Sequence, residues 1–294
     1  MGDPGGEWTV LRLIHWTRDY LARADVHEPR LAAEVLLADV LDCPRIQLYT
    51  QHDRVVAPEL LARFRQSVRR AAAGEPIAYV RGLKEFYSLT FKVTPDVLIP
   101  RPETELLVDA ALESVRAAEA PRLWDACTGS GCVAVAAARY AASLTVLATD
   151  ISPGALAVAR ENVRRHGLTA RVGVEHADLL DLPASAAGMA PFDVVTANPP
   201  YITDEQMGDL PGPVLREPDV ALRAGPTGLE CIRRIVRDAP ERLRPGGTLA
   251  MEIGLGQADD VYDLLRAAGR YEHVRFLKDL AGIDRTVVAR TRQP

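Results

Sequence analysis

The tetrapeptide Asn-Pro-Pro-Tyr at residues 198–201 places a carboxamide, two prolines and an aromatic ring directly after the apolar run FDVVTA. Prolines lack an N–H and restrict the residue before them, so the tetrapeptide could simply end a strand. The same stiffness could instead turn a backbone carbonyl towards a ligand, beside the acceptor oxygen of Asn198. The tetrapeptide alone does not separate these two interpretations, and its context must decide.

A glycine turn, Thr128-Gly129-Ser130-Gly131, separates the strand-like run RLWDAC from the helix-like run CVAVAAARYA. Glycines let the backbone turn tightly and approach a ligand, and the start of a helix offers free N–H groups. A tight turn without a ligand is the alternative. The dinucleotide fingerprint would place a third glycine at position 134, where this chain has alanine, and this weakens the case for a nicotinamide dehydrogenase without excluding it.

Two acids follow the next two strand-like runs. Asp150 ends LTVLATD, about twenty residues beyond the glycine turn, where a carboxylate can accept hydrogen bonds from both ribose hydroxyls. A helix N-cap is the alternative for Asp150, although Ser152 could serve as the cap. Asp178 follows ARVGVEHA and is well placed to meet an adenine amino group. Because the carboxyl ends of parallel strands meet at one edge, a single adenosine-bearing cofactor explains the turn and both acids.

Other catalytic patterns are missing from the sequence. We find no Gly-x-x-x-x-Gly-Lys phosphate loop, no serine nucleophile elbow and no histidine paired with an acid at useful spacing. The four cysteines form no C-x-x-C pair, so we expect no metal site and no disulfide framework. A site without an evident strong base suits methyl transfer from S-adenosylmethionine, whose sulfonium already activates the methyl group while the protein aligns the acceptor.

The elements that would position these residues belong to the α/β class. Residues 103–294 alternate strand-like and helix-like runs, which predicts a doubly wound, mostly parallel sheet, with YEHVRFLKD and DRTVVAR as an antiparallel pair at one edge. Residues 1–80 carry apolar groups at helical spacing and predict a small helical domain. Residues 81–102 predict a hairpin in EFYSLTFKV and a proline-rich linker, after which Thr104 or Glu103 opens a helix.

Composition narrows the class of protein further. The 294 residues carry a net charge of −5, which argues against a duplex-binding surface, and we expect no direct nucleic-acid binding. The start, MGDPGGEWTV, resembles no secretory leader, and no run approaches the roughly 18 apolar residues of a membrane span. We expect a cytoplasmic monomer that does not associate with membranes.

With these residues in view, the chain resembles the peptide chain release factor glutamine methyltransferases over nearly its whole length. The resemblance is carried by GEPIAYVRGLKEFYSLTFKV, VLIPRPETELLVDAAL, DACTGSG, DISPGALAVARENVRRHGL, FDVVTANPPYI, EPDVALRAGPTGLECIRRI, LRPGGTLAMEIGLGQ and KDLAGIDRTVVAR. It implies a Rossmann-like class I S-adenosylmethionine-dependent methyltransferase domain of seven strands behind a helical bundle that recognises the substrate. The implied reaction methylates the side-chain nitrogen of the glutamine in the Gly-Gly-Gln motif of release factors.

The resemblance also implies roles for individual residues. It assigns the cofactor to Cys127, Thr128, Gly129, Ser130, Gly131, Asp150, Ile151, Asp178, Leu179 and Asn198, and the substrate glutamine to Asn198, Pro199, Pro200 and Tyr201. Two positions depart from the family pattern. Cys127 stands where a glycine usually begins the loop, and a cysteine is tolerable there if the position keeps a negative φ. Leu179 stands where several relatives carry an aromatic side chain against the adenine, and leucine still offers apolar cover.

Four charged residues have two interpretations each. Glu217 and Glu230 are either secondary ligand contacts or, as we favour, capping or solvated acids. Arg101 and Glu103 either line the cofactor entrance or belong to a purely structural linker. The alternative functions are a methyltransferase acting on another protein glutamine, an enzyme methylating a base amino group, a non-catalytic binding module and a dehydrogenase.

Overall fold

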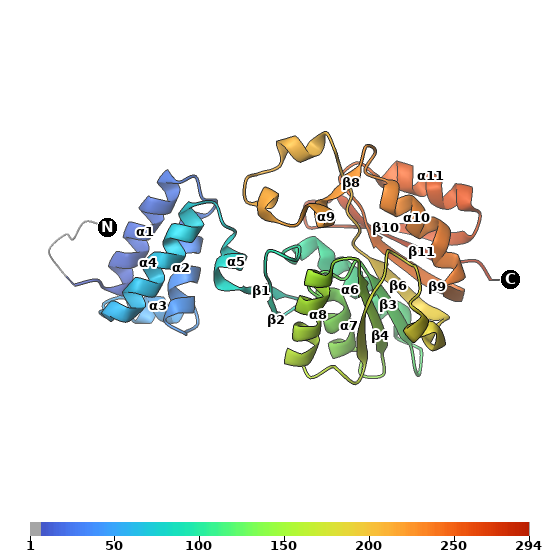
Figure 1. Ribbon diagram of the computed structural model, residues 1–294, viewed down its shortest axis with the longest axis horizontal. Helices are drawn as coiled ribbons and strands as arrows, with labels where there is room; N and C mark the ends of the chain where they lie inside the picture. Colours follow the sequence, from blue (N-terminus) through green and yellow to red (C-terminus); the bar gives the residue numbers. More distant parts are fainter. Residues whose placement is uncertain (1–6, 294) are drawn as a thin grey trace. The chain divides into compact units, whose positions relative to one another are not determined.

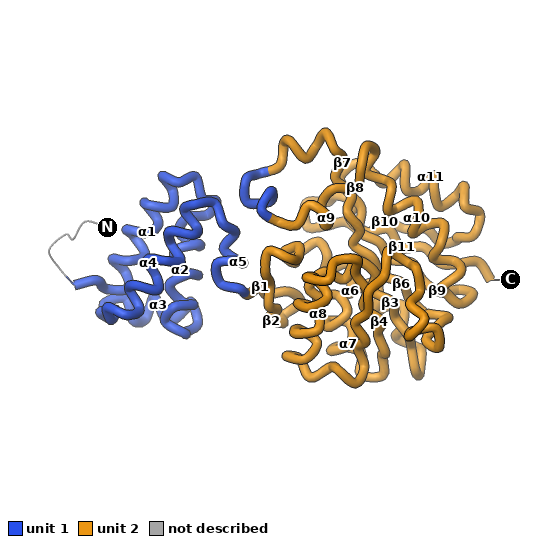
Figure 2. The backbone as a smooth tube through the Cα atoms, viewed as in Figure 1, with its two compact units in different colours: residues 1–82, 211–216 blue, residues 83–210, 217–294 orange. Residues whose placement is uncertain are grey.

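The computed structural model describes residues 7–293, and within the chain it separates two compact units. The first unit comprises residues up to 82 together with 211–216, and the second comprises residues 83–210 and 217–294 (Figure 2). Most of the amino-terminal stretch in which we saw no leader, residues 1–6, lies outside the described residues. None of the described helices is both long and apolar enough to cross a membrane.

The first unit is helical, as its periodicity predicts. The three expected helices are α1 (Val10–Arg23), α2 (Pro29–Val40) and α4 (Pro58–Ala72). Prolines begin α2 and α4 because the missing N–H costs nothing in the first turn of a helix. Two short helices were not predicted, α3 (Gln47–Thr50) and α5 (Ile77–Arg81). Their few residues carry too little periodic signal to separate a helical turn from a loop.

The second unit opens with the predicted hairpin of β1 (Leu83–Phe86) and β2 (Leu89–Lys92) and continues into a seven-stranded sheet. The strands are β3 (Arg122–Ala126), β4 (Thr145–Asp150), β5 (Val172–His176), β6 (Phe192–Ala197), β9 (Leu243–Glu252), β10 (Tyr271–Lys278) and β11 (Asp284–Thr291). Their order is β10-β11-β9-β6-β3-β4-β5. β11 pairs antiparallel with both β10 and β9 while the other neighbours in this sheet pair in parallel, which confirms the predicted antiparallel pair at this edge.

Helices cover both faces of the sheet, giving three layers (Figure 1). One face carries α6 (Glu105–Val115), α7 (Cys132–Tyr140) and α8 (Pro153–Arg165), and the other carries α10 (Glu230–Asp238) and α11 (Ala258–Ala268). Successive side chains of a strand point to opposite faces. Leu123 therefore packs in the first layer and Trp124 in the second, and both side chains are fully buried because helices cover both faces of the sheet here.

Short elements that were not predicted fill the region between β6 and α10. They are β7 (Ile202–Thr203), η3 (Gln206–Asp209), η4 (Val214–Arg216), α9 (Asp219–Leu222) and β8 (Arg223–Gly225). The remaining single turns are η1 (Pro102–Thr104), η2 (Ala184–Met189) and η5 (Ala239–Glu241). β7 and β8 pair with each other in parallel, outside the main sheet.

Candidate active site

One cavity in the second unit lies at the carboxyl ends of β3, β4, β5 and β6, where an open α/β sheet is expected to bind its ligand. Most of the residues that the sequence singled out line it: Cys127, Thr128, Gly129, Ser130, Asp150, Ile151, Asp178, Leu179, Asn198 and Pro200. Three predicted residues, Gly131, Pro199 and Tyr201, are not among the lining residues. Residues about seventy positions apart along the chain thus meet because each follows a parallel strand.

The glycine turn has the backbone that its composition predicts. Gly129 has φ +52° and its N–H donates to Asp150 Oδ2 at 2.9 Å. A side chain at Gly129 would meet no protein atom within 4 Å, so the loop leaves open space on this side. Gly131 has φ +78° and a Cβ there would lie 3.3 Å from Ala159 Cβ, so this glycine permits close packing of α7 on α8.

The backbone at Cys127 does not meet the condition of a negative φ under which a cysteine is easily tolerated. Cys127 has φ +55°, in the left-handed region, and so does Leu179 at +51°. A side chain costs free energy in this region because its Cβ approaches the following carbonyl oxygen. Both residues line the cavity, and strained backbone of this kind is characteristic of ligand sites. A glycine would adopt the positive φ at position 127 without strain, whereas the cysteine adopts it with strain.

Asp150 is held by the loops on both sides of it. Its Oδ2 accepts the Gly129 N–H and its Oδ1 accepts the Ser152 N–H, each at 2.9 Å. Burial raises the pKa of Asp150, and these backbone bonds act in the opposite direction. Ser152 caps α8 by accepting from Ala155 N, so Asp150 is not the helix cap. Each carboxylate oxygen keeps a free lone pair for a further donor.

Asp178 has a partner that the sequence did not reveal. Arg234 of α10 donates to both carboxylate oxygens, from Nη1 to Oδ1 at 3.2 Å and from Nη2 to Oδ2 at 2.9 Å. A bidentate pair fixes the orientation of a carboxylate as well as its position. No local pattern could have linked the two residues, because they lie 56 positions apart.

Asp125 was also missed, although an acid directly before the glycine turn was a visible signal. It accepts hydrogen bonds from the hydroxyls of Thr128, at 2.5 Å, and Thr196, at 2.7 Å. Burial raises the pKa of Asp125 to about 6, against the lowering effect of these two bonds. Its carboxylate therefore joins the first residue of the glycine turn to β6.

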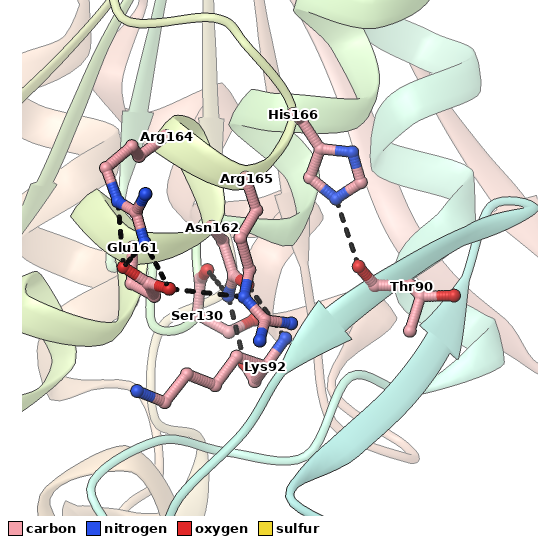
Figure 3. A network of polar contacts seen from close by, with 8 residues as sticks. All are labelled: Thr90, Lys92, Ser130, Glu161, Asn162, Arg164, Arg165 and His166. Atoms are coloured by element: carbon pink, nitrogen blue, oxygen red, sulfur yellow. Dashed lines mark hydrogen bonds and ion pairs between the residues drawn. The ribbon is translucent and has the colours of Figure 1, made fainter. Parts of the chain in front are cut away.

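Asn162 supports the glycine turn from behind (Figure 3). Its side-chain Nδ2 donates to the carbonyls of Ser130, at 2.8 Å, and Lys92, at 2.9 Å, while its Oδ1 accepts from Lys92 N at 2.7 Å. The residue is fully buried, and so the amide satisfies backbone groups of both the turn and the hairpin. An asparagine inside a helical pattern offered no sequence signal for this role.

Asn198 and Tyr201 are hydrogen-bonded to side chains from distant strands and turns. Asn198 Nδ2 donates to Thr104 Oγ1 at 3.3 Å, and the Tyr201 hydroxyl donates to Glu252 Oε1 at 3.2 Å. Thr104 opens α6 as predicted, but its side chain does not cap the helix and instead donates to Glu252 Oε2. Glu252 was missed, although an acid at the end of a strand facing the site was a detectable signal.

The structure gives a different outcome for each of the four charged residues that had two interpretations. Glu217 is buried, accepts from Ile99 N at 3.0 Å and pairs with Arg101, so our preferred reading of a capping or solvated acid was wrong for it. Glu230 is the first residue of α10 and accepts from Thr227 N and Oγ1 in the turn before the helix, each at 2.9 Å. Arg101 lines the cavity, and Glu103 is not among its lining residues. Among residues 7–293, no cluster of three or more His, Cys, Asp or Glu side chains is placed to hold a metal ion.

The fold and the site define a class I methyltransferase. Residues 124–210 match the methyltransferase domain family. The structure is also similar to a solved structure, the catalytic domain of hMettl16. The TM-score is 0.58 and the sequence identity 18%, and the match covers 81% of this chain and 83% of that one. That likeness concerns the fold alone.

The family follows from longer matches. Residues 12–82 match the PrmC N-terminal domain. A release factor glutamine methyltransferase of Moorella thermoacetica is 45% identical over 93% of this chain and 95% of its own length. One of Rhodopirellula baltica is 41% identical over 95% of each. The chain belongs to the release factor glutamine methyltransferase family.

Proposed function

We propose that this enzyme transfers a methyl group from S-adenosylmethionine to the side-chain nitrogen of the glutamine in the Gly-Gly-Gln motif of a peptide chain release factor. The observation that carries the proposal is the state of Asn198. Its side chain lines the cavity while its amide N–H is already used on Thr104, so its oxygen is left as an acceptor. An amide acceptor at this edge fits a substrate that itself offers an N–H.

The cavity residues fit an adenosine-bearing cofactor. Asp150 keeps lone pairs for the two ribose hydroxyls, and the open space beside Gly129 lets a ligand approach the backbone. Leu179, which is 7% exposed, offers apolar cover for the adenine, and the Asp178 carboxylate can accept from its amino group. When bound, S-adenosylmethionine would supply a methyl group activated by the positive sulfur, and breaking its S–CH₃ bond would leave neutral S-adenosylhomocysteine as the product.

The protein's main chemical task is to orient a weak nucleophile. An amide nitrogen delocalises its lone pair into the carbonyl, so alignment must contribute much of the acceleration. In our proposal, Asn198 Oδ1 and the backbone carbonyl of Pro199 accept the two N–H bonds of the substrate amide. Both acceptors favour the positive charge that develops on nitrogen as the new C–N bond forms. Tyr201 stacks on the amide plane, and the nitrogen loses one proton to water after transfer.

The partner assignments extend this proposal. We assign recognition of the release factor to the first unit, which matches a domain of its own in this family. We expect the enzyme to act in the cytoplasm as a monomer, without direct contact with nucleic acid or membranes. Size-exclusion chromatography with light scattering checks the monomer.

The test is a methylation assay with mass mapping. The purified chain is incubated with methyl-labelled S-adenosylmethionine and a purified release factor, and the modified residue is located in tryptic peptides. We expect one added methyl on the glutamine of Gly-Gly-Gln. A release factor carrying Gln→Glu at that position is the matched control and should stay unlabelled.

Two other outcomes would redirect the assignment. Label on another protein's glutamine, with the release factor unmodified, would point to the second candidate, a methyltransferase for a different protein. Label on RNA or DNA, offered in the same assay, would contradict a protein substrate altogether.

A further inference from the structure

Four side chains beside the cavity form one continuous hydrogen-bonded chain. Asn198 donates to Thr104, Thr104 donates to Glu252 at 2.6 Å, and Tyr201 donates to the other oxygen of Glu252. Thr104 and Glu252 are 3% and 2% exposed, so solvent does not compete for these groups. The members come from three separate places, the turn before α6, the end of β6 and the end of β9.

The number of protons on each side chain fixes which group donates and which accepts in these hydrogen bonds. A hydroxyl has one proton to donate, and an ionised carboxylate has none. Thr104 Oγ1 donates to Glu252 Oε2 at 2.6 Å and the Tyr201 hydroxyl donates to Oε1 at 3.2 Å. Burial raises the pKa of Glu252, and these two hydrogen bonds act in the opposite direction because they favour its ionised form. Since the Thr104 proton is committed to Glu252, only lone pairs of its oxygen face Asn198. Asn198 must therefore present its NH₂ group to Thr104.

We propose that Glu252 is a positioning residue which, through Thr104, sets the orientation of the Asn198 carboxamide. With the NH₂ group held by Thr104, the Asn198 oxygen is kept as an acceptor for the cavity that the residue lines. The inference rests on the proposed function, in which this oxygen accepts an N–H of the substrate amide. An amide turned by 180° would present donors to the substrate N–H, and the two would repel.

The same proton count predicts what single substitutions do. In Glu252→Gln the new NH₂ group can donate to Thr104, which frees the Thr104 proton for the Asn198 oxygen and lets the amide turn over. Thr104→Val keeps the side-chain shape and removes the link entirely. Thr104→Ser keeps the hydroxyl, and with it the hydrogen-bonded connection from Glu252 through residue 104 to Asn198, which we call the relay.

The kinetic test separates positioning from folding. Turnover, KM for the release factor and the cofactor dissociation constant are measured for Glu252→Gln, Thr104→Val and Thr104→Ser. We expect kcat to fall about 10- to 100-fold in the first two, with cofactor affinity changed less than about twofold, and Thr104→Ser to stay within about threefold of wild type.

A matched control lies next to Glu252 on the neighbouring strand, β11. Thr286 pairs with Glu252 in the β9–β11 register, is fully buried, and its hydroxyl has no hydrogen-bond partner among the described residues. Thr286→Val removes a buried hydroxyl beside the same glutamate without touching the relay. It should leave kcat unchanged.

A second measurement does not depend on the methyl acceptor. The side-chain NH₂ signals of Asn198, identified in ¹⁵N spectra by their loss in Asn198→Asp, should shift in Glu252→Gln and remain in place in Thr286→Val. Wild-type enzyme that is inactive on release factors would refute the proposed function and leave this measurement intact. Unchanged signals would overturn the inference, as would full turnover in both relay variants, or a turnover loss matched by lost cofactor binding. Should Glu252→Gln fail to fold, the Thr104 valine and serine variants decide.

Discussion

Arg234 and Asp178 face each other in two parallel contacts, Nη1 to Oδ1 at 3.2 Å and Nη2 to Oδ2 at 2.9 Å, at the part of the cavity assigned to the adenine. Both side chains are partly exposed, so the pair adds little to the free energy of folding. Its effect is to hold the carboxylate in one orientation.

Loss of this pair should weaken cofactor binding. Arg234→Ala lets the Asp178 carboxylate rotate, and we expect the dissociation constant of S-adenosylmethionine, measured by calorimetry, to rise about three- to tenfold. Turnover at saturating cofactor should stay near wild type. Arg237→Ala is the control, because Arg237 lies on the same helix, pairs with Asp238 and is not among the residues that line the cavity. Equal affinities in the two variants would contradict the role of Arg234.

Removal of the Asn198 carboxamide should abolish turnover and spare the cofactor. In Asn198→Ala the substrate amide loses an acceptor needed as charge develops on its nitrogen, and we expect kcat to fall about a hundredfold or more. Single-turnover assays with labelled cofactor measure the loss, and a titration checks binding. Turnover at the wild-type rate would remove Asn198 from the mechanism.

A glycine at position 127 should relieve backbone strain. Cys127 has φ +55°, which costs an L-residue about 1 kcal/mol or more relative to glycine. Since alanine and glycine both lack the thiol, comparing Cys127→Gly with Cys127→Ala isolates the backbone. We expect the glycine variant to unfold at higher denaturant, with a difference of about 1 kcal/mol. A more stable alanine variant would show that the left-handed backbone carries no strain.

Two buried threonines should respond oppositely to the same substitution. The Thr286 hydroxyl lacks a partner within the described part of the chain, so Thr286→Val should raise the free energy of unfolding by about 1 kcal/mol. The Thr149 hydroxyl accepts from Trp124 Nε1 at 2.8 Å. Thr149→Val would leave that indole N–H unpaired and should cost about 1–3 kcal/mol. Denaturant unfolding measures both, and changes of equal sign would refute the argument.

Asp125 should make stability depend on pH in the acid range. Burial raises its pKa from 3.8 to about 6, so between these values the folded state holds a proton that the unfolded state releases. The free energy of unfolding should therefore fall by about 3 kcal/mol at most as the pH rises from about 4 to 6. Above pH 6 the contribution of Asp125 should no longer change. Asp125→Asn lacks this contribution. Unfolding curves of both proteins across pH 4–7 test it, and parallel pH profiles would contradict the shift.

Local sequence patterns determined the class of fold and the main parts of the site. The spacing of apolar residues along the sequence predicted the sheet and its helices, because each strand or helix must turn its apolar side chains towards a buried layer. The glycine turn, Asp150, Asp178 and Asn198 could be predicted because each follows its strand directly, and parallel strands end at one edge.

Only the tertiary structure decided how these residues are held and oriented. Thr104 and Glu252 lie 148 positions apart and meet because η1 and the end of β9 converge beside the site. Arg234 and Asn162 act through similar long-range contacts. Such partners depend on side-chain packing between distant elements, which no local period records. The left-handed backbone at Cys127 is likewise imposed by the turn around it, and the residue's own preference runs the other way.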